Sequence, residues 1–578
     1  MNVFRALVIG LPMTFSFLSS QASAGCDCKS TSGDPCTGRS VSVPVVNGRQ
    51  VSVTWTFSSS GGDAFCGTFA NGDFWVAPST PDGTVVIESV SSTGSGAVSV
   101  DENPQLEKMG LLSATKPYGN YSAAENLANA FPRSFSGSTS LVAAVQRDEV
   151  INGKCGTSAI LGNCVDVYNV LTVLSAAPLK QGIETLRPAI DEKSKDLMTW
   201  EDFDLSRIPQ VAYATTPTDS QLLAIRQRWS FNTEVLGVKS ITGDTYSEGG
   251  RAFRASLIAD DYGAGVAKAW HDDLFSVFAS SSASKARTEA LAAMITYGKD
   301  LYFAIYGPNG RERNWGSGAG QSLGKFPPAV FFAAMSKDSR FGDNLRTTSE
   351  TLLDFDDLRG PHELDQVNTG AKTPVWGDFP AAMTDLDIRA YWGGLLKSQC
   401  FAGALGSCSV SSGKRTSRDP YGYIDGPPNR PGAGYLPVSL GPQKALVAEM
   451  FLIPQMCDIV NFDRLVEYVD RHVDVGLYTN DDPCAAPDPR EDPLTCDVYR
   501  NVGCKYYGVT WGDSASSPGT CIQNAVGRFP ALHGTKIQPL YGTPAVESNW
   551  KRIRGVAASC TRPVARQVPP APPALNVL

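Results

Sequence analysis

The sequence predicts a multidomain protein in which an N-terminal β-sandwich over residues 25–180 precedes a mostly helical α/α toroid over residues 181–475. Apolar residues alternate with polar ones in the first part, which is the period of a half-buried strand. In the second part they recur at three- and four-residue spacing, the period of an amphipathic helix. A third observation, six cysteines after residue 456, predicts a disulfide-rich C-terminal region.

The predicted strands of the first part are short, and Gly, Ser and Pro separate them. Apolar residues alternate from Val51 to Phe57, directly after the hairpin signal Asn47-Gly48. Further strands are predicted over Thr84–Val90 and Val167–Leu174. Several short strands joined by such turns favour a β-sandwich.

The predicted helices of the second part are joined by long connections rich in Trp, Tyr, Asp, Arg and Gly. Such a pattern fits a toroid, in which loops at one end of the helices build a cleft. An irregular α-helical bundle is the alternative. The predicted helices are Gln221–Trp229, Ala264–Ala279, Ala286–Tyr297, Pro328–Ser336, Asn344–Leu353, Met383–Leu396, Gln443–Leu452 and Phe462–His472.

The C-terminal part divides into a disulfide-rich region of the toroid, residues 476–560, and a flexible Pro-rich tail, residues 561–578. The chain has 14 cysteines, an even number, which indicates disulfides in an exported protein. Zinc is disfavoured, because the chain has no CxxC pair and only four histidines. No cofactor is expected, and calcium at the acidic loops is the alternative left open.

Residues 1–24 have the pattern of a secretory signal peptide, with Arg5 before an apolar run and Ala22-Ser23-Ala24 as the cleavage site. Lipidation of Cys26 is the alternative. Ser23 argues against it, because lipoprotein signals usually have an aliphatic residue at that position. No later apolar run reaches the length of a membrane span. We therefore expect a secreted or periplasmic protein with no membrane span.

Composition narrows the class of partner. The chain is 42% hydrophobic and 19% charged, which excludes a wholly disordered protein. Its net charge of −8 argues against a nucleic-acid partner, because phosphate neutralisation needs a surplus of Lys and Arg. HExxH and Walker-type loops are missing from the sequence.

The first candidate site lies at Tyr297–Trp315, where a predicted helix ends and a polar loop begins. Tyr302 and Tyr306 are four residues apart, so they share one face if the helix continues. The loop offers cations, an amide and an aromatic ring, which suit the hydroxyls and the apolar face of a sugar. A solvated turn with one buried tyrosine is the alternative. The candidate residues are Asp300, Tyr302, Arg311, Arg313, Asn314 and Trp315.

The second candidate site is a predicted loop, Asp354–Asp378, that is crowded with titratable groups. Crowded carboxylates raise one another's pKa, which lets an acid and a base coexist near neutral pH. The alternative is a loop whose acids pair with Arg359 or bind calcium. The candidate residues are Asp356, His362, Glu363 and Trp376.

The third candidate site is the loop Arg418–Gly432, in which rings, carboxylates and guanidinium groups alternate with rigid Pro and permissive Gly. Tyr421 and Tyr423 are candidates for stacking on a substrate, and Asp425 is a candidate acid or base. A loop that packs its tyrosines back on the helices is the alternative. The other histidines, among them His271 inside a predicted helix, are expected to be structural.

These features together resemble exported bacterial carbohydrate-active enzymes that combine an N-terminal β-sandwich with an α/α toroid. The likeness is to an architecture shared by toroid glycoside hydrolases and toroid polysaccharide lyases, and it implies cleavage of glycosidic bonds in a polysaccharide or oligosaccharide. The segments that carry it are Phe69–Val76, Tyr297–Tyr302, Gly324–Pro327, Asp419–Gly426 and Phe462–Arg471.

Two reactions stay open. Hydrolysis needs two carboxyl groups at one bond, with Asp300, Asp356, Asp357, Glu363 and Asp425 as candidates. β-Elimination needs a cation or amide on a uronate and a base such as Tyr302 or His362. The many loop carboxylates favour hydrolysis. A non-catalytic glycan-binding surface protein is a third hypothesis.

Overall fold

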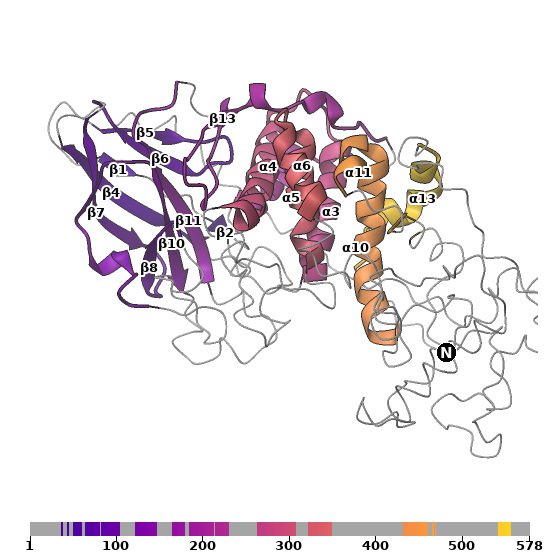
Figure 1. The fold of residues 1–578 in the computed structure, drawn as a ribbon. Coiled ribbons are helices and arrows are strands. Elements are labelled where there is room, and N and C mark those ends of the chain that lie inside the picture. Colours follow the sequence, from indigo (N-terminus) through magenta and orange to yellow (C-terminus); the bar gives the residue numbers. More distant parts are fainter. Residues whose placement is uncertain are drawn as a thin grey trace, which may run out of the picture.

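The computed structural model describes most of two regions, one rich in strands and one helical (Figure 1). Figure 1 shows the strands, in indigo and purple, on one side of the molecule and the helices on the other, with α13 farthest from the sheets. The described residues are 36–38, 43–44, 50–60, 64–80, 82–104, 122–146, 165–179, 184–212, 214–230, 263–307, 322–348, 432–460, 465–466, 469 and 541–556.

The first sheet has four antiparallel strands in the order β1-β4-β7-β9. Its longest strands are β4 and β7, which pair along eight residues of β4. Val53, Trp55 and Phe57 of β4 are buried and their neighbours are half-exposed, so the predicted alternation is confirmed. The strands are β1 (Cys36–Gly38), β4 (Val53–Ser60), β7 (Thr84–Ser92) and β9 (Arg133–Phe135).

The second sheet has five strands in the order β5-β6-β11-β10-β8. All neighbours are antiparallel except β6 and β11, which run parallel. The strands are β5 (Ala64–Thr68), β6 (Phe74–Pro78), β8 (Val98–Glu102), β10 (Thr139–Gln146) and β11 (Val165–Val173). The remaining strands of the described residues form two short pairs: β2 (Val43–Pro44) with β3 (Gln50–Val51), and β12 (Thr185–Leu186) with β13 (Met198–Thr199).

The two sheets share one apolar core. Trp55 and Ile87 of the first sheet belong to the same buried cluster as Leu141 and Leu171 of the second. One polar contact crosses this core, since the Trp55 indole N–H donates to Asn169 Oδ1 at 2.7 Å. Buried Trp N–H groups need such a partner, so the bond also fixes how the sheets face each other.

The second sheet is buried on both faces. Along β10, Leu141, Ala143 and Val145 enter the core between the sheets. Val142 and Ala144 alternate with them and enter the core of the helical region. Because strand side chains alternate, this continuous apolar run is what a sheet covered on two sides requires. The described residues thus form three layers: first sheet, second sheet and helices.

The helical layer is built on a cluster of large rings. Trp229 of α2, Trp270 of α3 and Tyr297 of α4 lie with ring centroids 4.9–6.1 Å apart, and all are buried. The α-helices of the described residues are α2 (Asp219–Ser230), α3 (Gly263–Ala279), α4 (Lys285–Tyr306), α5 (Phe326–Met335), α6 (Ser339–Thr348), α10 (Gly432–Leu452), α11 (Pro454–Val460) and α13 (Pro544–Val556). The same part of the chain has the 3₁₀-helices η1 (Leu127–Asn129), η4 (Trp200–Asp202), η5 (Leu205–Arg207) and η8 (Ser322–Gly324).

Helix ends follow local capping. The Ser284 hydroxyl accepts a hydrogen bond from the Arg287 N–H and so begins α4. The last turn of α4 ends at Gly307, whose N–H donates to the Phe303 carbonyl at 2.6 Å. The sequence predicted an end at Tyr297, and this was wrong: Tyr297 is buried in the ring cluster, and the helix runs on to Tyr306. Helix α10 likewise begins before the predicted Gln443, and it includes Pro437 and Pro442, which the prediction placed outside the helix.

Several sequence predictions lie outside the described residues: the signal peptide, the helix Met383–Leu396, most of Phe462–His472, and the tail. The β-sandwich and the α/α toroid stay predictions. Cys66 and Cys457 are disulfide-bonded, as expected for two of the cysteines. Within the described part of the chain, every helix falls short of the length or apolar character that a membrane crossing requires.

Candidate functional site

The candidate site is built on the turn between β5 and β6. In this turn the Phe69 N–H donates to the Asp73 carbonyl at 2.8 Å, and the Asn71 side-chain amide donates to Asp73 Oδ2 at 2.8 Å. Gly72 has φ +98°, a conformation that side-chain-bearing residues rarely adopt. A Cβ at this position would also collide with the guanidinium of Arg226. The sequence Asn-Gly-Asp therefore suits this turn for steric reasons.

The turn is bonded to the helical layer and to the segment that leads into it. We call this segment, the described residues 184–212 between β11 and α2, the linker. The Ser230 hydroxyl of α2 donates to the Asn71 carbonyl at 2.6 Å, and Arg226 Nε donates to the same oxygen at 3.3 Å. On the linker side, the Ala70 N–H donates to the Thr185 carbonyl at 2.8 Å. The second sheet is thus bonded to α2 through backbone groups of a single turn.

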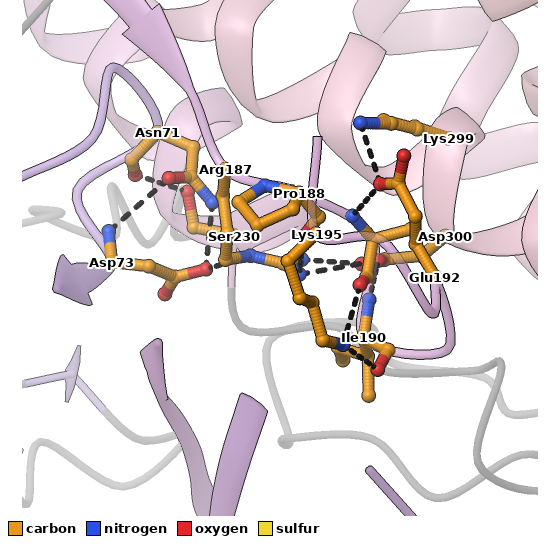
Figure 2. Close-up of polar contacts among 11 residues, drawn as sticks. Asn71, Asp73, Arg187, Pro188, Ile190, Glu192, Lys195, Ser230, Lys299 and Asp300 are labelled. Carbon is orange, nitrogen blue, oxygen red and sulfur yellow. Dashed lines mark hydrogen bonds and ion pairs between the residues drawn. The ribbon is translucent and has the colours of Figure 1, made fainter. Parts of the chain in front are cut away.

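Arg187 bridges two carboxylates from different layers (Figure 2). Its Nε donates to Asp73 Oδ2 at 2.6 Å, and its two terminal nitrogens donate to the two carboxylate oxygens of Asp300 on α4. The Arg187 residue is 2% exposed, and both acids are equally buried. We call Asp73, Arg187 and Asp300 the interlayer junction. A planar guanidinium suits it, because it can bind carboxylates on two sides at fixed angles.

Burial and charge oppose each other in the junction. Burial raises the pKa of Asp73, and the nearby Arg187 only partly offsets that effect. Burial works against the charge of Arg187, but Asp300 and Asp73 outweigh it, so the pKa of Arg187 is raised. The guanidinium therefore stays charged, and its two partners depend on that charge.

The linker segment after Arg187 is held by hydrogen bonds within itself and by an ion pair with α4. Glu192 Oε2 accepts from the Ala189 N–H at 3.0 Å and lies 2.8 Å from the Lys299 ammonium. The Lys195 ammonium donates to the Ala189 carbonyl at 3.1 Å and also to the carbonyl of Ile190 (Figure 2). Lys195 is buried, with φ +52°. Such left-handed backbone in a non-glycine residue concentrates at functional or over-determined sites.

Lys195 is also electrostatically unusual. Burial first, and then the charge of Arg187, lowers its pKa to about 7. Near neutral pH, a lysine of this kind is divided between its ammonium and amine forms, so it can donate or accept a proton. This property alone distinguishes it from an ordinary surface lysine.

The linker lies against the last turn of α4. A Cβ built on Gly307 would be 2.7 Å from Asp191 Oδ2, so the linker and the end of α4 are in contact there. Arg187 meets the same helix two turns earlier, at Asp300. The segment from Arg187 to Lys195 therefore holds the C-terminal third of α4 in place.

Asp300 is the first predicted catalytic residue that the structure describes. Its oxygens accept hydrogen bonds from Arg187 and from the Ile190 N–H at 2.9 Å, and the residue is 2% exposed. This geometry suits a contact between layers. A catalytic role for Asp300 stays a prediction that these contacts do not favour.

Tyr302 is the second predicted catalytic residue that the structure describes, and it lies on another side of α4 from Asp300. Its hydroxyl accepts from the Asn344 side-chain amide at 2.7 Å, and its ring lies 4.5 Å from that of Tyr306. The two tyrosines thus share a face, as their spacing predicted. Burial raises the pKa of Tyr302 to about 12. A phenol that stays protonated can donate a proton but cannot act as a base at neutral pH.

Asp300 and Tyr302 are the only predicted site residues that fall within the described part of the chain. The other twelve lie outside it, so the structure does not test whether they come together. They are Arg311, Arg313, Asn314, Trp315, Asp356, Asp357, His362, Glu363, Trp376, Tyr421, Tyr423 and Asp425.

Sequence reasoning missed the linker residues Arg187 and Lys195 and a buried pair between α3 and α10. In that pair, His271 Nδ1 lies 2.6 Å from Glu449 Oε1, and both residues are fully buried. Burial raises the pKa of Glu449, and His271 partly offsets this. One signal was visible: Glu449 is the single charged residue in the apolar run Ala445–Leu452. A lone charge in such a run predicts a buried partner.

Within the described ranges, no group of three or more His, Cys, Asp or Glu side chains is arranged to hold a metal ion. No family model, no curated protein and no solved structure matches the chain.

Proposed function

We propose that the chain is an exported carbohydrate-active enzyme that cleaves glycosidic bonds of a polysaccharide by hydrolysis with paired carboxylates. One observation supports the proposal: helix ends gather at one end of the helical layer, where sugar-binding loops would have to be held. The contacts that establish this are between α3, α4 and η8.

Helices α3 and α4 run antiparallel. Arg287 Nε, near the start of α4, donates to the carbonyl of Val277, near the end of α3, at 3.2 Å. Midway, the rings of Trp270 and Tyr297 lie 6.1 Å apart. The start of α3 at Gly263 and the end of α4 at Gly307 are therefore at the same end of the layer.

The start of α5 reaches this end too. A Cβ built on Gly324 would lie 2.7 Å from the Gly263 carbonyl oxygen, so η8 touches the first turn of α3. Residues 308–321, which contain Arg311, Arg313, Asn314 and Trp315, connect Gly307 with η8. Binding residues are often found on loops between rigid elements, and cations, amides and rings suit a sugar.

In this proposal, Asp356, Glu363 and Asp425 are the candidates for the acid and the base or nucleophile, because Asp300 is engaged by Arg187. Trp315, Trp376, Tyr421 and Tyr423 would stack on sugar rings. The alternative is β-elimination on a uronate, where Arg311, Arg313 or Asn314 neutralises the carboxylate. Its proton donor could be Tyr302, because that phenol stays protonated. His362 would then be the base.

The test is to incubate the purified protein with neutral and uronate-containing polysaccharides and to follow reducing ends and ultraviolet absorbance together. New reducing ends without absorbance indicate hydrolysis, and both signals together indicate β-elimination. Under hydrolysis, Asp356→Asn, Glu363→Gln or Asp425→Asn should lower kcat at least ~100-fold. Asp343→Asn, an exposed acid of α6, is the matched control and should retain activity. Binding without turnover on any glycan would instead favour the glycan-binding hypothesis.

A further inference from the structure

A buried histidine–glutamate pair joins α3 to α10 inside the helical layer. His271 Nδ1 lies 2.6 Å from Glu449 Oε1, and both residues are 0% exposed. Within the described part of the chain, the other polar atoms of the two side chains, His271 Nε2 and Glu449 Oε2, have no hydrogen-bond partner. Among these residues, each side chain therefore has the other as its hydrogen-bond partner.

The surroundings of the pair on its two helices are apolar. Leu274 and Phe275, one turn after His271, belong to the large buried core of the helical layer. Ala445 and Leu446, one turn before Glu449, belong to the same core. A charge on the pair is therefore far from water, where it would be most costly.

Charged groups on the nearest elements do not compensate the pair. Burial raises the pKa of Glu449, and the charge and hydrogen bond of His271 are what oppose this effect. Several of the nearby charges are already engaged in ion pairs with one another or with α2. The nearby charged residues of α3, α10, α13 and the start of α5 are Lys268, Asp272, Asp273, Lys325, Lys444 and Glu547.

The number of protons on the pair decides its net charge. A neutral imidazole beside a carboxylate carries one negative charge. One added proton makes the pair neutral overall, either as imidazolium with carboxylate or as imidazole with carboxylic acid. A second added proton leaves a positive charge. Because an uncompensated buried charge costs several kcal/mol, the form with one added proton is the one that this core favours.

We propose that His271 and Glu449 form a proton lock between α3 and α10: the folded pair keeps one shared proton, and losing it at higher pH weakens the contact of the two helices. In an unfolded chain, glutamate is ionised above about pH 4.3 and histidine loses its proton near pH 6.5. Between these values, the folded and the unfolded pair bind the same number of protons. Above about pH 6.5 only the folded pair holds its proton, so the stability that it contributes decreases as pH rises, until the pair releases the proton.

Denaturant unfolding of Glu449→Gln at about pH 5 and about pH 6 tests the proton count. This variant lacks the carboxylate, so His271 is neutral in the folded state and protonated in the unfolded chain. Its unfolding equilibrium constant, divided by that of the parent, should therefore fall up to about tenfold between the two pH values. Glu547→Gln removes an acid that pairs with Lys444 instead, and it is the matched control with a constant ratio. A constant ratio for Glu449→Gln would overturn the proposal.

A second variant keeps the test decisive if Glu449→Gln does not fold. The double variant His271→Leu/Glu449→Leu is apolar at both positions, a replacement that is often neutral or stabilising for a buried pair. The unfolding equilibrium constant of the parent, divided by that of the double variant, should be constant between about pH 5 and about pH 6 and should rise up to about tenfold per pH unit above about pH 6.5. Lys195 is present in both proteins, so its contribution cancels in the ratio. A ratio that falls between about pH 5 and about pH 6, or stays constant above about pH 6.5, would show that the folded pair keeps no shared proton.

Discussion

The second sheet is held on its two sides by different forces. Toward the first sheet, it packs through an apolar core that includes Trp55, Leu141 and Leu171, crossed by the bond from Trp55 to Asn169. Toward the helices, apolar packing is joined by the interlayer junction of Asp73, Arg187 and Asp300. Apolar burial supplies free energy without direction, whereas a bidentate guanidinium fixes distance and angle. The contact between the two sheets therefore mainly stabilises the fold, whereas the interlayer junction also sets the position of α4.

The largest effect should come from breaking the junction. Arg187→Met would leave the carboxylates of Asp73 and Asp300 buried without their cation, and it should cost about 3–5 kcal/mol of unfolding free energy. Urea unfolding of the purified protein measures this. Arg340→Met removes a cation from an exposed pair with Asp338 and should change the free energy of unfolding far less than Arg187→Met does, because solvent screens that pair. Equal losses for the two variants would mean that the junction contributes no more than a surface ion pair.

The next prediction concerns how the unfolding free energy depends on pH through Lys195, on the linker side of the second sheet. The pKa of Lys195 is about 7 in the folded protein and 10.5 when unperturbed, so between these values the unfolded chain binds a proton that the folded chain does not. Unfolding free energy should therefore rise with pH in this window, by at most about 1.4 kcal/mol per pH unit. Denaturant unfolding at about pH 7.5 and about pH 9, both inside this window, measures the slope.

Lys195→Met should remove this slope, whereas Lys285→Met, at an exposed position of α4, should leave it unchanged. The apolar cluster between the sheets that contains Trp55 holds no titrating side chain, because its one cysteine, Cys66, is disulfide-bonded. We therefore expect the pH effect to come from the linker side. A slope that survives Lys195→Met would assign it to another group.

A smaller effect should follow from breaking the contact between the sheets. Trp55→Phe keeps a large ring in the core but removes the donor to Asn169 Oδ1, and we expect a loss of about 1–3 kcal/mol. A double-mutant cycle with Asn169→Ala isolates the bond. A coupling free energy near zero would show that Trp55 acts through its volume alone.

The same contrast explains what the sequence could predict. Period-two and period-3.6 patterns report apolar faces, and they located β4, β7, β11 and α3 to within a few residues. They carry no information on which distant charges meet. Arg187 is separated from both Asp73 and Asp300 by more than 100 residues along the chain, and their pairing depends on how a turn, a linker and a helix pack. Tyr302 and Tyr306 were predictable because a helix alone brings them together.

The smallest stability effect should come from Tyr302, on the side of α4 away from the junction. Tyr302→Phe removes one hydrogen bond, from the Asn344 amide, and should cost about 0.5–1.5 kcal/mol. Tyr306→Phe is the matched control, since that hydroxyl donates to the Asn344 carbonyl at 2.7 Å. If Tyr302 is the proton donor of a β-elimination, Tyr302→Phe should lower kcat by at least ~100-fold on a uronate glycan, while Tyr306→Phe should not. Equal activity in both variants would make Tyr302 a packing residue, and α4 would then serve the site only by the placement that Arg187 gives it.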